Sequence, residues 1–126
     1  MATLIAYTQA AVTGSWISVI ETGAYLAKAE KLMSEQERNT VVEMVSQDPH
    51  CGDVIPGTGG FRKVRIGIGD RGKSGGARVI YYFYNETAPV FLTSVFAKNE
   101  KQNLSKAERN ELARVATTIV ESLRRR

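Results

Sequence analysis

Four basic residues fall where neighbouring β-strands would bring their side chains together: Lys63, Arg65, Arg78 and Lys98. Residues 63–68 alternate between cationic or small side chains and β-branched ones, so this predicted strand carries its cations on one face. The same parity places Arg78 on that outer face of the return strand, and Lys98 closely follows the third strand. Crowded cations repel one another unless an anion binds between them, and the crowding favours loss of a proton from a lysine. The pattern therefore indicates an anion-binding site in which a lysine can act as a base.

Aromatic residues share the predicted cationic face. The parity that directs Arg78 outward also directs Tyr82 and Tyr84 outward, and tyrosines beside cations suit stacking on unpaired RNA bases. The outer faces of sheets also carry Lys and Arg simply to resist edge pairing and aggregation. This simpler explanation accounts for Lys63 and Arg65 but accounts less well for the two tyrosines.

The charge of the chain is divided unevenly along its length. Residues 1–60 hold three basic side chains and seven acidic ones, which gives this half a net charge of −4. Because the whole chain carries +4, the remaining residues carry +8. A positive charge concentrated in one half favours a polyanionic partner. A solvated basic surface without a ligand would produce the same distribution.

Size and composition restrict the class of protein. A chain of 126 residues with 43% hydrophobic residues is expected to form one folded domain over residues 1–126. A single histidine and a single cysteine exclude a His-based zinc site, a catalytic histidine pair and an internal disulfide, so we expect no metal or other cofactor. The sequence has no readable signal peptide and no apolar run near the ~20 residues that span a bilayer, so we expect a cytoplasmic protein.

Periodicity and capping signals predict an α+β domain. The predicted elements are a strand at 15–21, helices at 24–32 and 34–47, an antiparallel meander of strands at 63–68, 77–84 and 89–96, and a helix from residue 105. Both Ser34 with Glu37 and Ser105 with Glu108 have the spacing of a capping box. We expect the meander to pack against the N-terminal helices and the C-terminal helix, all on one face of the sheet. Residues 1–14 are an extra strand, a disordered extension or the product of an upstream start codon.

Three segments carry a family resemblance: GDVIPGTGGFR at residues 52–62, GKSGGARVIYY at 72–82 and AKNEKQNLSKAE at 97–108. In this order they resemble the HigB/RelE toxins of bacterial type II toxin–antitoxin modules, with close similarity to the HigB-type branch. The resemblance covers about residues 16–120. It implies a RelE/ParE-like microbial ribonuclease fold and a metal-independent endoribonuclease that cleaves mRNA in the ribosomal A site. It also implies a cognate antitoxin, typically a helix-turn-helix protein of the HigA type.

The resemblance further implies roles for the four cations. Arg65 and Arg78 are expected to bind the scissile phosphate and offset its developing charge. Lys63 would accept the proton of the ribose 2′-hydroxyl and Lys98 would protonate the leaving oxygen, although these two roles are interchangeable. Further contacts to RNA are expected from nearby basic and aromatic residues: Arg62, Arg71, Lys73, Tyr82 and Lys101.

Two other functions on the same scaffold remain open. One is a ParE-like gyrase inhibitor, against which the retained cations argue. The other is a catalytically inactive module that binds RNA or antitoxin. It stays open because RelE's arginine after the third strand has no counterpart at residues 98 and 99, and its C-terminal tyrosine has none in residues 99–110. The antitoxin is expected to be acidic and to cover the cationic face, or else to dock in a helical groove near residues 41–45.

Overall fold

The computed structural model describes residues 4–12, 15–69, 75–101 and 103–125. Its elements are β1 (Leu4–Val12), β2 (Ser15–Thr22), α1 (Gly23–Leu32), α2 (Glu35–Gln47), β3 (Asp53–Val54), β4 (Phe61–Ile66), β5 (Ala77–Tyr82), β6 (Val90–Ala97) and α4 (Lys106–Arg124). The predicted α+β class is confirmed, and each predicted helix and strand has a counterpart. The two-residue strand β3 was not predicted.

The strands form one six-stranded sheet in the order β1-β2-β6-β5-β4-β3. The strands β4, β5 and β6 are antiparallel neighbours, which confirms the predicted meander. The strand β2 runs parallel to β6, so the sheet is mixed. The strand β1 pairs antiparallel with β2, so residues 4–12 form the extra strand that was one of three alternatives for this segment.

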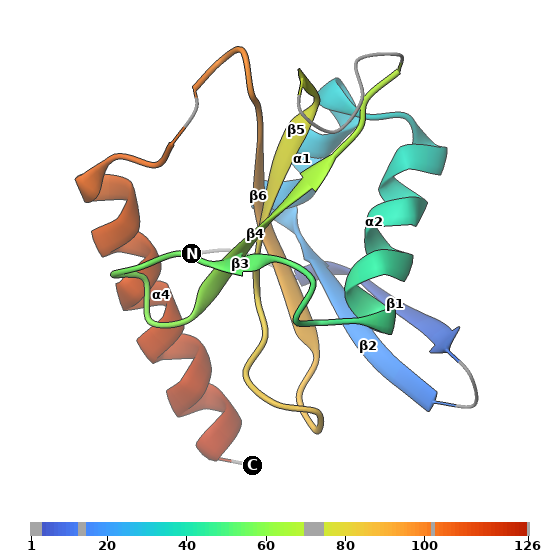
Figure 1. Cartoon of the computed structure of the whole chain (residues 1–126). Coiled ribbons are helices and arrows are strands. Elements are labelled where there is room, and N and C mark those ends of the chain that lie inside the picture. The colour runs from blue at the N-terminus through green and yellow to red at the C-terminus, as the bar shows by residue number, and fades with distance from the viewer. Residues whose placement is uncertain (1–3, 13–14, 70–74, 102, 126) are drawn as a thin grey trace.

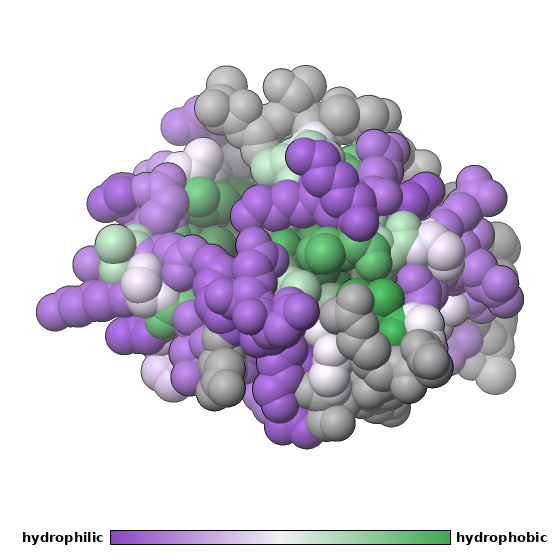
Figure 2. All heavy atoms as spheres, turned by 90° about the horizontal axis from the view of Figure 1, so that it is seen from above, coloured by the Kyte–Doolittle hydropathy of each residue, from purple (hydrophilic) through white to green (hydrophobic). Residues whose placement is uncertain are grey.

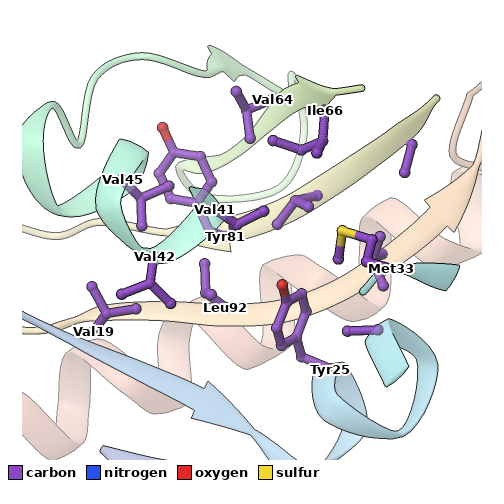
Figure 3. Packing of buried hydrophobic residues seen from close by; sticks show 14 of the residues in the cluster. Val19, Tyr25, Met33, Val41, Val42, Val45, Val64, Ile66, Tyr81 and Leu92 are labelled. Carbon is purple, nitrogen blue, oxygen red and sulfur yellow. The ribbon is translucent and has the colours of Figure 1, made fainter. Parts of the chain in front are cut away.

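The larger core lies between the sheet and the two N-terminal helices. Figure 3 shows Val64 and Tyr81 of the sheet gathered with Val41 and Val45 of α2 in this cluster. The inward position of Val64 and Tyr81 confirms the predicted parity of both strands. Val41 and Val45 are 0% exposed, so these two side chains belong to the core and cannot themselves line a groove for the antitoxin. Antitoxin docking elsewhere on the helices near residues 41–45 stays a prediction.

Helix α4 covers the opposite face of the sheet (Figure 1). Its apolar side packs on a second cluster that contains Phe61, Ile80, Tyr82, Phe96 and Ala116. The prediction that all helices share one face is therefore wrong. The outer face of β5 carries large apolar side chains, which are stable only when covered, and the apolar stripe of an amphipathic helix supplies that cover.

Both predicted capping boxes are confirmed. The Ser34 hydroxyl accepts from the Glu37 N–H at 3.1 Å, and the Glu37 carboxylate accepts from the Ser34 N–H at 2.9 Å. Ser105 and Glu108 repeat this arrangement at the start of α4. The Gly69 N–H also donates to Glu37 at 2.8 Å; this bond, followed by that from Ser34, lowers the pKa of the Glu37 carboxyl. Over the part of the chain that is described, no helix combines the length and the apolar character needed to cross a membrane.

The glycine-rich turn before β4 packs under α4. The buried Thr58 hydroxyl donates to the Ile55 carbonyl at 2.7 Å and accepts from the Phe61 N–H at 3.1 Å. Gly59 has a φ of +74°, and a Cβ at this position would lie 3.0 Å from the Cβ of Ala116. The turn therefore acts as a support for α4 that requires glycine for both its backbone angle and its close contact.

We expect Gly59→Ala to destabilise the protein more than Gly57→Ala does. Both glycines have a positive φ, of +74° and +78°, so each substitution strains the backbone by about 1–2 kcal/mol. At Gly57 a Cβ meets nothing within 4 Å, whereas at Gly59 it crowds Ala116 and adds about 1 kcal/mol or more. Urea unfolding of the two variants measures the difference. Equal losses of unfolding free energy would contradict the close packing of this turn on α4.

Candidate active site

All four predicted catalytic residues line a single hollow on the α4 face of the sheet. This cationic hollow has a volume of ≈ 230 Å³ and is lined by Asp53, Lys63, Arg65, Arg78, Lys98 and Asn103. Viewed from above, the end of the molecule where β6 leads into α4 is covered largely by hydrophilic side chains, with apolar atoms visible between them (Figure 2). The predicted convergence of the four cations is therefore present in the structure.

Strand register determines which of these side chains are neighbours. Arg65 of β4 is paired with Arg78 of β5, and Asp53 of β3 is paired with Lys63 of β4. Residues directly opposite each other in an antiparallel pair point to the same face of the sheet and lie close together. The site is therefore positioned mainly by backbone pairing, which holds its charged side chains on a rigid surface.

Arg78 is the most enclosed cation of the hollow. It is 7% exposed, and its Nη1 donates to the Ala77 carbonyl at 3.2 Å. Burial, followed by the neighbouring charge of Arg65, lowers the pKa of the Arg78 guanidinium, although this group keeps its proton at neutral pH. Arg78 lies on the predicted outer face of β5, so this part of the prediction is confirmed. The expected exposure to solvent is wrong, because Arg78 is buried. A partly desolvated guanidinium binds phosphate strongly because water competes less for its donors.

The other three cations are more accessible. Lys63 and Lys98 are half-buried, and Arg65 is exposed. The Lys98 N–H donates to the Gly76 carbonyl at 3.0 Å, which holds the segment after β6 beside the start of β5. Within the described residues, neither Lys63, Arg65 nor Lys98 forms a salt bridge. With respect to the described residues, these three charges are therefore open to an anion.

Two residues of the hollow were not predicted. Asp53 is the one acidic residue among those that line it, and it opens β3, a strand too short to show an alternating pattern. Asn103 lies between β6 and α4, where no periodicity places a side chain. Asp53 lowers the net positive charge of the hollow. It also adds a carboxylate to a site in which both proton-transfer roles are predicted for lysines.

Two residues predicted to bind RNA do not face the cationic hollow. Tyr82 is 4% exposed and its ring centroid lies 4.9 Å from that of Phe61, under α4, so the prediction that a base stacks on Tyr82 is wrong. Arg62 precedes Lys63 on β4, so its side chain points to the opposite face of the sheet. It donates to the Gly52 carbonyl at 2.8 Å and to the His50 carbonyl at 3.4 Å. It anchors the segment before β3, on the other face of the sheet from the hollow.

The remaining predicted RNA contacts have mixed outcomes. Lys101 pairs with Glu108, and its Nζ lies 5.3 Å from the centre of the Phe96 ring, so its charge supports the start of α4. The bond from Lys101 is also the main reason why the pKa of the Glu108 carboxyl is lowered. Arg71 and Lys73 lie outside the described residues, so their predicted contacts to RNA are untested.

The histidine and the cysteine lie against the other core. The His50 ring contacts the Phe83 ring edge-on at 5.1 Å between centroids, and the Cys51 Sγ lies 3.7 Å from the Tyr81 hydroxyl. Phe83 and Tyr81 both belong to the cluster on the α1 and α2 side. Neither residue lines the cationic hollow. Among the residues that the structure describes, no group of three or more His, Cys, Asp or Glu side chains is arranged to hold a metal ion.

Comparison with known families identifies a single shared domain. The model of the family described as the RelE toxin of the RelE/RelB toxin–antitoxin system matches residues 23–125. The match runs from the start of α1 through α4 and includes every residue that lines the cationic hollow. The hairpin of β1 and β2 precedes it.

Proposed function

The chain belongs to the RelE toxin family of the RelE/RelB toxin–antitoxin system, and from this premise we propose that it is an endoribonuclease that cleaves mRNA in the ribosomal A site and so inhibits translation. The observation that supports the proposal is the convergence of Lys63, Arg65, Arg78 and Lys98 in one hollow. We also propose that it belongs to the HigB-type branch, on the resemblance carried by residues 52–62, 72–82 and 97–108, and that it acts in the cytoplasm.

The proposed reaction is an in-line attack within the RNA. The ribose 2′-oxygen bonds to the adjacent phosphorus, the bond to the 5′-oxygen breaks, and the products are a 2′,3′-cyclic phosphate and a 5′-hydroxyl. Arg78 and Arg65 hold the non-bridging oxygens and offset the added negative charge of the phosphorane. Lys63 accepts the proton of the 2′-hydroxyl and Lys98 donates a proton to the leaving 5′-oxygen, or the two exchange roles. These steps use side chains of the hollow alone.

Cleavage on translating ribosomes tests the proposal. The purified protein is added to ribosomes that translate a defined mRNA, and the new 5′ ends are mapped by primer extension. We expect cuts within A-site codons. Supercoiling by gyrase is assayed in parallel, because inhibition of gyrase without mRNA cleavage would instead support a ParE-like function. Binding of RNA without cuts, and without an effect on gyrase, would support the inactive module.

We propose that the antitoxin is a HigA-type protein that covers the cationic hollow with acidic side chains. Opposite charges that approach in water attract less as salt screens them, so we expect the dissociation constant to rise at least about tenfold between about 0.05 M and 0.5 M salt. The variant with Lys63, Arg65 and Arg78 replaced by alanine should bind weakly at both salt concentrations. Calorimetric titration measures both. Flat affinity across the salt range, or unchanged binding by the triple variant, would contradict occlusion of the hollow.

A further inference from the structure

A second hollow adjoins the cationic one. It has a volume of ≈ 420 Å³ and is lined by Ile55, Pro56, Gly57, Lys63, Asn103, Leu104 and Arg109. Lys63 and Asn103 line both hollows, so these two side chains form the boundary between them. We call the second space the side hollow. A ligand held by the cationic hollow can therefore extend past Lys63 into the side hollow.

The side hollow differs from its neighbour in chemistry. Ile55, Pro56 and Leu104 give it apolar walls, whereas the lining of the cationic hollow is charged or polar throughout. Its polar groups are the Asn103 amide, which can both donate and accept, and the two cations, Lys63 and Arg109. No acidic side chain is among the residues that line it. A flat apolar body with a polar edge and an adjoining negative charge matches these features.

The walls of the side hollow are held in place before any ligand binds. The Ile55 N–H donates to the Phe61 carbonyl at 2.8 Å, and the Ile55 carbonyl accepts from the buried Thr58 hydroxyl. The Arg109 Nη1 donates to the Leu104 carbonyl at 2.9 Å, which orients the guanidinium at the start of α4. Groups that are already ordered lose little conformational entropy on binding, so this surface is suited to recognition.

We infer that the side hollow binds the base of a nucleotide next to the scissile phosphate, and that Asn103 and Arg109 determine which base is preferred. Single-stranded RNA is recognised through bases that rest on apolar or guanidinium surfaces and hydrogen-bond through their edges. The shared boundary at Lys63 places such a base beside the phosphate that Arg78 and Arg65 would hold. This inference rests on the proposed function, because it assumes an RNA chain in the cationic hollow.

Base preference tests the inference directly. The probes are RNA hexanucleotides with a 2′-deoxy sugar at the scissile position, which prevents cleavage, and with each of the four bases in turn on either side of that position. We expect the wild-type protein to bind the best base at least about tenfold more tightly than the worst, since a well-placed pair of hydrogen bonds discriminates by that much. Asn103→Ala should reduce the ratio to about twofold or less. Arg109→Met, which keeps the apolar stem of the side chain, should reduce it as well.

Control variants and a second readout separate this inference from the proposed function. Asn110 is exposed on α4 and lines neither hollow, so Asn110→Ala should keep the wild-type ratio. On translating ribosomes, Asn103→Ala should redistribute cuts among codons. If the wild-type protein cuts A-site mRNA but Asn103→Ala and Arg109→Met both keep its base ratio and its pattern of cuts, the base subsite is wrong and the proposed function stands. If these two substitutions weaken the binding of all four hexanucleotides equally, the two side chains contact only phosphate, and this result would also overturn the subsite. Absence of any cleavage by the wild-type protein would instead count against the proposed function.

Discussion

Replacing Arg78 with methionine is expected to abolish growth inhibition in cells and to slow A-site cleavage by about 10²–10³-fold. This is the loss seen when one preorganised donor to a developing negative charge is removed. Arg78 is 7% exposed and faces the paired Arg65, so it is the cation whose contact with a phosphate has the least competition from water. Methionine has a similar length, so it keeps most of the packing around the side chain while removing the charge. Single-turnover cleavage by the variant on programmed ribosomes measures the effect.

Stability of the Arg78→Met variant distinguishes a site residue from a structural one. Burial and Arg65 both disfavour the charged form of Arg78, whereas its hydrogen bond to the Ala77 carbonyl favours it, so an apolar replacement of similar volume should change the melting temperature little. Lys28→Met removes a charge from an exposed position on α1, away from both hollows, and should keep full activity. Full growth inhibition by Arg78→Met would show that the site is misplaced. A variant that fails to fold would be replaced by Arg65→Met, since Arg65 is exposed and lines the same hollow.

Strand parity was the part of the site that the sequence could predict. A residue in a β-strand faces one side or the other, so Lys63, Arg65 and Arg78 had to share a face once the two strands were paired in the observed register. The same rule placed Val64 and Tyr81 in the core. Local periodicity carries this information because it depends on backbone geometry alone.

The position of α4 could not be predicted in the same way. An amphipathic helix shows which of its own sides is buried, but not which face of a sheet it covers. The available signal was the pair Ile80 and Tyr82, whose apolar bulk on the outer face of β5 requires cover. Tyr82 was interpreted instead as a platform for bases, and it is a core residue. Asp53 was missed because only the pairing of the two-residue strand β3 with β4 brings it beside Lys63.

Cleavage of the same mRNA is expected to be at least about 10²–10³-fold faster on the ribosome than in free solution. The residues that line the cationic hollow include four cations and one carboxylate but no imidazole, since the His50 ring rests on Phe83 on the far side of the sheet. Arginine does not deprotonate, so acid–base assistance within the hollow is limited to two lysines and Asp53. The hollow is also small beside an extended RNA chain and contacts only a short stretch of it, so we expect it to align the 2′-oxygen, the phosphorus and the 5′-oxygen poorly without help. The ribosome would hold the mRNA in this alignment. Correct orientation of reacting groups is known to accelerate reactions by factors of this size and larger.

Rates measured on one mRNA at matched salt, with and without programmed ribosomes, test this dependence. Salt must be matched because the cationic hollow attracts any RNA more strongly at low ionic strength. The Arg78→Met variant serves as the control for contaminating nucleases in both arms, since cleavage that this substitution does not slow does not come from the hollow. If the wild-type protein cuts free RNA as fast as A-site mRNA, then the hollow aligns the substrate unaided and the acid–base inventory assigned to it is incomplete. If the rate on ribosomes exceeds that on free RNA by the expected factor and falls with Arg78→Met, orientation comes from the ribosome and charge stabilisation comes from the toxin.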